Sequence, residues 1–194
     1  MTQKMKTHKI TVTAMLAAVA TVLMFLEFPV PFLIPPFVKM DFSELPALLA
    51  SFSLGPVYGG VVCLIKNLIC CLRTNTGCVG ELANFLIGLC FVLPAGFIYR
   101  HKKSRKSALI GSIVGAVVMA LASIPLNYFI SYPVYSKLIP IDAIIGLYQT
   151  IRPDVNGLLE CLVLFNAPFT LIKGVLDVAL CFLIYKPLSP LLHK

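Results

Sequence analysis

Long apolar runs separated by short polar segments dominate the chain. A helix that crosses the hydrocarbon core of a bilayer needs about 20 apolar residues, and the chain repeatedly supplies runs of that order. With 59% hydrophobic and only 12% charged residues, the composition leaves little material for a soluble domain. The pattern predicts an all-α integral membrane protein. The apolar runs lie near residues 10–28, 45–72, 82–99, 107–131 and 160–185.

The second run carries a helix-breaking signal in its middle. Gly55-Pro56 interrupts it, and proline both removes a backbone donor and disfavours helical geometry in the residue before it. The run is therefore expected to form two helices, the first too short to cross a bilayer without tilt, thinning or partial re-entry. We expect a bundle of six transmembrane helices in a single membrane domain, residues 1–194. The expected helices span about 10–28, 45–54, 57–72, 82–99, 107–131 and 160–185.

The positions of the basic residues predict the topology. The net charge of +8 is concentrated in the N-terminal arm, in RHKKSRK at 100–106 and at the C-terminus, where no acidic residue occurs. Short segments rich in Lys and Arg stay in the cytoplasm, and only a break at Gly55-Pro56 places all three there. Both termini are therefore expected to be cytoplasmic. Because this clustering is typical of topology signals, nucleic acid is not expected as a partner.

Three outer segments follow from this topology, and they hold nearly all the acidic residues. Segment 29–44 is rich in proline and still apolar, so we expect it to fold back over the bundle as a cap. Segment 73–81 is short and polar. Segment 132–159 is expected to be a long loop, and loops of that length are usually functional or disordered. The acidic residues are Asp41, Glu44, Glu81, Asp142, Asp154 and Glu160.

A polar stripe marks the last apolar run. Asn166, Thr170, Lys173 and Asp177 follow offsets of 0, 4, 7 and 11, which place them within roughly 60° of arc on a helix. Ionisable groups in a membrane normally face the bundle interior or a wet cavity. The stripe therefore predicts a polar pocket that opens to the exterior. The alternative is a structural ion pair between Lys173 and Asp177, with the other two residues bonding neighbouring helices.

Polar residues on other helices are expected at the same depth, which favours a ligand site over a structural stripe. Aromatic and apolar residues of the cap and helices surround them. Such a site suits a flat, partly apolar molecule with a hydrogen-bonding edge and a polyol tail. It has one deep lysine and no arginine cluster, so it does not suit a polyphosphate. The polar residues are Lys66, Asn67, Glu81, Asn84, Asn127 and Tyr128, and the apolar ones are Phe32, Phe37, Met40, Phe42, Phe85 and Phe129.

Motifs for intrinsic catalysis are missing from the sequence. It contains no H-E-x-x-H, C-x-x-C or G-x-S-x-G motif and no phosphate-binding G-x-x-x-x-G-K-[ST] loop. We therefore expect no enzyme activity, no metal and no cofactor, and a partner must supply the energy if a ligand is concentrated. The alternatives are a small membrane enzyme that uses Asp177 or Glu81, and a facilitator that needs no partner. The cysteines read as small core residues, with a Cys71–Cys78 bridge left open.

Two small-residue motifs allow another helix to approach closely. They are Ala14-x-x-x-Ala18 in the first run and Gly111-x-x-x-Gly115 in the fifth. Each serves either a partner protein or packing within the bundle.

Six stretches together resemble a known family. The chain is similar to the substrate-binding S components of energy-coupling factor (ECF) transporters, and most closely to those specific for riboflavin. The combination covers nearly the whole chain and is more specific than any single piece. The stretches are KMDFSELPALLASFSLGP (39–56), IKNL (65–68), GELANFLIG (80–88), RHKKSRKSALIG (100–111), LNYF (126–129) and PFTLIKG (168–174).

The resemblance implies a transport role in the cell membrane. It implies six helices with cytoplasmic ends, riboflavin capture from outside, and docking onto a transmembrane coupling subunit and two ATP-binding-cassette ATPases. Ala14 and Ala18 match the family's docking motif, and the S component is thought to topple in the membrane to release its vitamin. An S component for another vitamin, such as thiamin or biotin, is the alternative.

The resemblance also implies ligand contacts. Asn127 and Lys173 match positions expected to hydrogen-bond the flavin. Thr170 departs from the family pattern, which has Asn there, and its shorter side chain bears on specificity. The expected binding set is Lys39, Met40, Asp41, Phe42, Glu81, Asn84, Asn127, Asn166, Thr170 and Lys173.

Overall fold

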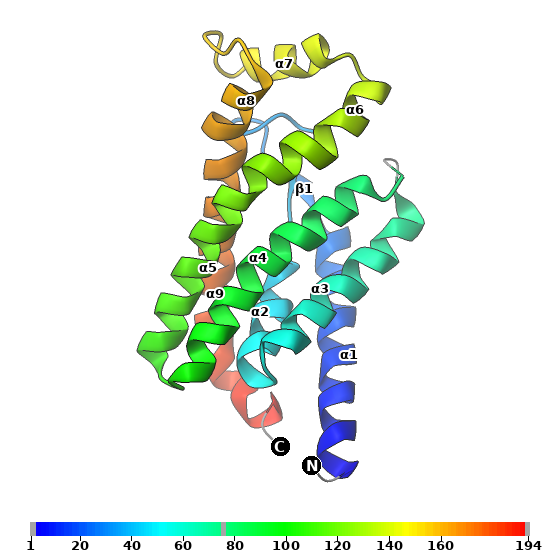
Figure 1. Ribbon diagram of the computed structural model, residues 1–194. Coiled ribbons are helices and arrows are strands. Elements are labelled where there is room, and N and C mark those ends of the chain that lie inside the picture. The colour runs from blue at the N-terminus through cyan, green and yellow to red at the C-terminus, as the bar shows by residue number, and fades with distance from the viewer. Residues whose placement is uncertain (1–2, 75–76, 193–194) are drawn as a thin grey trace.

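The chain forms a helical bundle with one small β-ladder. The computed structural model describes the backbone of residues 3–74 and 77–192 (Figure 1). Strand β1 (Phe28–Pro29) pairs antiparallel with β2 (Lys39–Met40) in the cap. The helices are α1 (Gln3–Phe25), α2 (Glu44–Ser53), α3 (Pro56–Cys70), α4 (Val79–His101), α5 (Arg105–Leu126), α6 (Tyr132–Leu138), α7 (Ile141–Gln149), α8 (Leu158–Cys161) and α9 (Ala167–Leu192).

Three short segments of different helical pitch join these elements. A 3₁₀ turn, Cys71–Arg73, follows α3. A π-helical segment, Asn127–Ser131, joins α5 to α6, and a second, Leu162–Asn166, joins α8 to α9. Because the backbone stays helical through the first π segment, the helix that begins with α5 runs from Arg105 to Leu138. The expected end of the fifth helix at residue 131 was therefore too early.

Among the described residues, five helices are long and apolar enough to cross a membrane. They are Met5–Phe25, Pro56–Arg73, Val79–His101, Arg105–Leu138 and Leu158–Tyr185. Helix α2 is not one of them, since its ten residues extend about 15 Å, roughly half the hydrocarbon core. Every residue from Glu44 to Phe52 is buried, so α2 is an internal helix. The count of six spanning helices stays a prediction.

A glycine-proline turn folds α3 back against α2. Gly55 has φ of 121°, a left-handed conformation that side chains with a Cβ rarely adopt, and Pro56 starts α3 in the first turn, where its missing donor costs nothing. Gly59 then lets the two helices touch, because a Cβ there would lie 2.8 Å from the carbonyl oxygen of Ala47. This close approach sets the N-terminus of α2 beside the second half of α3.

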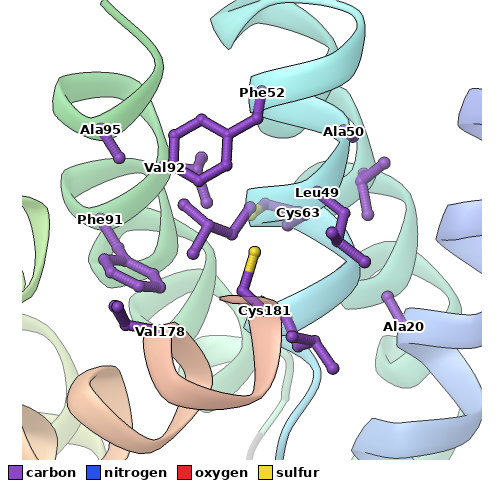
Figure 2. Packing of buried hydrophobic residues seen from close by; sticks show 14 of the residues in the cluster. Ala20, Leu49, Ala50, Phe52, Cys63, Phe91, Val92, Ala95, Val178 and Cys181 are labelled. Atoms are coloured by element: carbon purple, nitrogen blue, oxygen red, sulfur yellow. The ribbon is translucent and has the colours of Figure 1, made fainter. Parts of the chain in front are cut away.

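The main core surrounds α2 (Figure 2). Leu48 of α2 and Cys63 of α3 are fully buried, as are Phe91 of α4 and, nearly so, Val178 of α9. Helix α5 packs closely on α4, because a Cβ at Gly111 would lie 2.7 Å from the carbonyl oxygen of Ala95. The Gly111-x-x-x-Gly115 motif therefore serves packing within the bundle.

A second core holds the cap and the segment between α5 and α9 together. Segment 132–159 was expected to be a loop, but it contains helices α6 and α7. Ile144 and Tyr148, one turn apart on α7, are both buried in this core. That burial explains the error, because a short helix needs only one or two apolar residues on one face to dock. Figure 1 places α6–α8 at the end of the molecule opposite the start of α1 and the end of α9.

Candidate functional site

A cavity of about 510 Å³ lies between the cap and helices α1, α4, α5–α6 and α9. Its size is within the range usual for pockets that hold drug-sized ligands. Polar and charged side chains from segments far apart in sequence line it together. The expected binding residues that line it are Lys39, Asp41, Glu81, Asn84, Asn127, Asn166, Thr170 and Lys173.

Two expected binding residues lie elsewhere. Met40 is buried in the second core, and the ring of Phe42 packs against the ring of Phe28, with centroids 6.2 Å apart. Successive side chains of an extended segment point to opposite sides. Lys39 and Asp41 therefore reach the cavity while the residues between and after them do not.

The lysine of the stripe forms an ion pair with the cap. Lys173 Nζ donates to Asp41 Oδ2 at 2.8 Å. The other oxygen of Asp41 accepts from the backbone N–H of Ser43 at 2.8 Å and from its hydroxyl. Burial opposes ionisation of Asp41, but the charges of Lys173 and Lys66 and these hydrogen bonds hold the pKa of its carboxyl well below its usual range.

The alternative Lys173–Asp177 pair is wrong. Lys173 pairs with Asp41, and neither carboxylate oxygen of Asp177 has a hydrogen-bond partner among the described residues. Asp177 is fully buried and does not line the cavity. The stripe therefore lines the cavity at Asn166, Thr170 and Lys173 but not at Asp177.

A second buried ion pair supports the first. Lys66 Nζ lies 2.7 Å from Glu44 Oε1 and 2.5 Å from Ser43 Oγ. Lys66 and Asn67 were expected at the ligand site, yet neither lines the cavity. Since Ser43 also bonds Asp41, a continuous polar chain runs from Glu44 through Lys66 and Ser43 to Asp41 and Lys173. It ties α2, α3, the cap and α9 together beneath the cavity.

Of the three asparagines that line the cavity, two lie on the π-helical segments. Asn127 Oδ1 accepts from Ser131 Oγ at 3.0 Å, and Asn166 Oδ1 accepts from the Tyr148 hydroxyl at 2.7 Å. Each amide oxygen thereby accepts one hydrogen bond inside the protein, and each amide group still has N–H to donate to a ligand. Single π-turns inside helices are frequent at functional sites.

More exposed polar residues mark the opening of the cavity. Lys39 pairs with Glu27 at 2.5 Å, and both side chains are about 40% exposed (43% and 40%), so the pair contributes little to stability. Glu81 accepts from Thr74 Oγ1 at 2.9 Å. Asn84 Nδ2 lies 4.0 Å from the sulfur of Met24.

Several lining residues were missed from the sequence. Ser131, Tyr132 and Tyr135 line the cavity but had been assigned to the outer loop or its edge. Ser131 and Tyr135 follow Asn127 by four and eight residues, so they share its helix face. This spacing would identify both residues if the helix were extended beyond residue 131. Of the aromatic residues expected around the ligand, Phe37 lines the cavity, whereas Phe32, Phe85 and Phe129 do not.

The remaining candidate features lie outside the cavity. Ala14 and Ala18 are exposed on α1, so no other helix in the described part of the chain covers their face. All seven cysteines lie in the described part and are free thiols. Cys71 and Cys78 form no disulfide there, and Cys78 Sγ lies 3.7 Å from the carbonyl oxygen of Cys71. Among the described residues, no three His, Cys, Asp or Glu side chains cluster as metal ligands.

Comparison with known proteins places this architecture in one family. The family model for the ECF transporter, substrate-specific component, matches residues 8–185. The riboflavin transporter RibU of Staphylococcus aureus (strain TCH60) is 39% identical over 181 residues, covering 93% of this chain and 90% of that protein. The riboflavin transporter FmnP of Bacillus subtilis (strain 168) is 32% identical over 193 residues, covering 98% and 96%.

A solved structure agrees with these relatives. It is described as "Structure and mechanism of the S component of a bacterial ECF transporter", and it superposes with a TM-score of 0.76 at 36% identity, covering 97% of this chain and 99% of that one. The apolar helices are those of a membrane protein. The chain belongs to the family of substrate-specific S components of ECF transporters.

Proposed function

We propose that this protein binds riboflavin on the outer side of the cell membrane and delivers it for ATP-driven uptake. The relatives named as riboflavin transporters support the ligand. The observation that carries the proposal is the cavity wall, where Asn127, Asn166 and Lys173 offer hydrogen-bond donors to one cavity. The pyrimidine edge of a flavin carries carbonyl and ring-nitrogen acceptors beside a single N–H donor, so most of the partners that it requires are hydrogen-bond donors.

The rest of the cavity suits the other parts of riboflavin. Phe37, Met119 and Phe169 line it and offer apolar surface to a flat aromatic ring. Glu81 and Asn84 lie in the same lining and offer partners to the hydroxyls of a ribityl chain. Thr170 replaces the amide of the family pattern with a hydroxyl, which still donates and accepts but reaches less far.

The proposal assigns the energy to partner subunits. In it, a transmembrane coupling subunit and two ATP-binding-cassette ATPases drive uptake, and the protein itself catalyses no reaction. The exposed Ala14 and Ala18 on α1 offer a flat surface on which a partner helix packs closely. Both termini lie on the cytoplasmic side in this proposal.

Binding to site variants tests the assignment. Quenching of riboflavin fluorescence by the purified protein gives the dissociation constant. The Asn127→Ala, Lys173→Ala double variant removes one neutral and one charged donor, so we expect binding to weaken by about 100-fold or more. Because Lys173→Ala leaves Asp41 without its partner, Asn127→Ala is also measured alone, with an expected loss of about 10-fold.

Matched substitutions outside the cavity supply the control. Asn156 and Lys137 are exposed and belong to the same end of the molecule. The Asn156→Ala, Lys137→Ala double variant is expected to bind as the wild type does. If the cavity variants also bind with wild-type affinity while folded, the site is wrongly assigned.

One residue of the cavity bears on the alternative that the ligand is another vitamin. The resemblance implies Asn at the position of Thr170, and Thr170 lines the cavity one helical turn before Lys173. An S component for thiamin or biotin is therefore the runner-up. A competition panel separates the two. If riboflavin is the ligand, thiamin and biotin at stoichiometric concentration do not displace it. If thiamin or biotin is the ligand, that vitamin binds at stoichiometric concentration and riboflavin does not.

A further inference from the structure

Tyr148 occupies a position behind the cavity wall. It belongs to α7 and its side chain is fully buried. Its hydroxyl lies 2.5 Å from the hydroxyl of Tyr132 and 2.7 Å from Asn166 Oδ1. Tyr132 and Asn166 line the cavity, whereas Tyr148 does not. Tyr148 therefore contacts the binding wall without contacting the ligand space.

The distances favour one orientation of the Asn166 amide toward Tyr148. An O–H···O bond is typically 2.7–2.8 Å long, and an N–H···O bond about 2.9–3.0 Å. The 2.7 Å separation from Tyr148 fits the amide oxygen as acceptor. The amide nitrogen then lies 3.5 Å from the Tyr132 hydroxyl, a weak bond at best. At least one N–H of Asn166 is thus left for another acceptor.

The Tyr148 ring is held so that its hydroxyl keeps this position. Phe37 packs edge-on against it, with centroids 6.1 Å apart and planes at 86°, and Phe165 packs at 5.3 Å. A buried phenol keeps hydrogen-bond partners, and the Tyr148 hydroxyl has two of them, the Tyr132 hydroxyl and the amide oxygen of Asn166. If the amide were reversed, its nitrogen would meet the hydroxyl and its oxygen would face the cavity.

We propose that Tyr148 is a positioning residue that holds the Asn166 side chain with its amide N–H directed to the ligand. The proposal rests on the riboflavin function proposed above. It makes the wall of the cavity prefer a ligand that presents an acceptor to Asn166. Helix α7, which a sequence pattern assigned to a loop, becomes part of the specificity of the site.

A double-mutant cycle separates this role from a general structural one. Riboflavin dissociation constants are measured by fluorescence quenching for wild type, Tyr148→Phe, Asn166→Ala and the double variant. We expect Tyr148→Phe to weaken binding by about 5- to 10-fold in the wild-type background. In the Asn166→Ala background the same change is expected to weaken binding by less than about 2-fold, because the residue it acts through is gone.

A matched control removes a hydroxyl elsewhere at the same depth. Tyr128 lies on the same π segment as Asn127 but is 40% exposed and does not line the cavity. Tyr128→Phe is expected to bind riboflavin as the wild type does. If Tyr148→Phe weakens binding equally in both backgrounds, or not at all, the positioning role is overturned.

Asn166→Asp provides a test that does not require Tyr148→Phe to fold. A carboxylate accepts from Tyr148 but, like alanine, has no N–H to donate, and its negative charge repels an acceptor on the ligand. This variant is therefore expected to bind riboflavin more weakly than Asn166→Ala. Asn166→Asp binding as tightly as Asn166→Ala, or more tightly, would overturn the inference. Absence of riboflavin binding by the wild type would instead refute the proposed function, so the two failures are distinguishable.

Discussion

Two buried lysines, one in the cavity wall and one behind it, show how charge is held inside an apolar bundle. Lys66 pairs with Glu44, and Lys173 pairs with Asp41. A buried ion pair is weak evidence of stability in itself, but removal of one partner leaves an uncompensated charge. Ser43 joins the two pairs, so the position of Lys173 in the cavity wall depends in part on Ser43 and Lys66, which do not line the cavity.

The Lys66–Glu44 pair gives a prediction at the scale of the residue. Lys66→Met leaves Glu44 buried and unpaired, and we expect it to lower the free energy of unfolding by about 3–5 kcal/mol. The exposed Lys39–Glu27 pair is the control, and Lys39→Met is expected to change it by less than about 1 kcal/mol. Thermal unfolding of the ligand-free proteins in detergent measures both. Equal stability of Lys66→Met and the wild type would refute the account of the buried pair.

At the scale of the element, the contact between α2 and α3 brings together the first two members of the polar chain, Glu44 and Lys66. Gly59 permits this contact, because any Cβ would strike the backbone of α2. The contact brings Lys66 within 2.7 Å of Glu44. The internal helix α2 is thus fixed by a glycine in its neighbour and by an ion pair at its own N-terminus.

A glycine substitution tests this contact. Gly59→Ala is expected to lower the free energy of unfolding by about 1–3 kcal/mol, because overpacking against backbone is not relieved by side-chain rotation. Gly60→Ala is the matched control: its nearest neighbour is the end of the Leu89 side chain, at 3.1 Å. That variant is expected to be as stable as wild type or slightly more so, since alanine favours the helix. The two variants are compared by thermal unfolding, and equal losses would contradict the packing account.

At the scale of the whole molecule, the charge distribution predicts orientation. The segment 100–106 and the start of α1 lie toward the end of the bundle opposite α6–α8 (Figure 1), and the cavity lies on the side of the cap. If basic segments stay in the cytoplasm, the cavity opens outward. This orientation depends on how α2 is counted, because its ten residues are too few to cross the bilayer without tilt or thinning.

Reporter fusions test the orientation. A reporter that is active only in the cytoplasm is expected to work when inserted at residue 103 and when fused to either terminus. Insertion after residue 153, between α7 and α8, is expected to leave it inactive. Cytoplasmic activity of the 153 insertion together with inactivity at 103 would reverse the orientation and place the cavity on the wrong side for capture from outside.

Most of the spanning helices and much of the site could be predicted from the sequence, for physical reasons. Apolar length identifies a spanning helix without tertiary information, and Asn166, Thr170 and Lys173 share a face because helical geometry is local. The partner of Lys173 could not be predicted this way, because Asp41 lies 132 residues away while Asp177 lies within one turn.

The other errors have the same origin in long-range packing. Met40 and Phe42 leave the cavity because a two-residue ladder sets the register of the cap. The helices in segment 132–159 form because Ile144 and Tyr148 dock on a core built from distant residues. Tyr148 itself carries no sequence signal for a role at the site, since its position depends on that docking.

The most direct test of riboflavin capture is the visible absorption spectrum of the protein purified in detergent from cells grown with riboflavin, with the released ligand identified by mass. The account predicts a yellow protein that releases riboflavin at about one molecule per chain. A colourless protein that leaves the fluorescence of added riboflavin unchanged would contradict it.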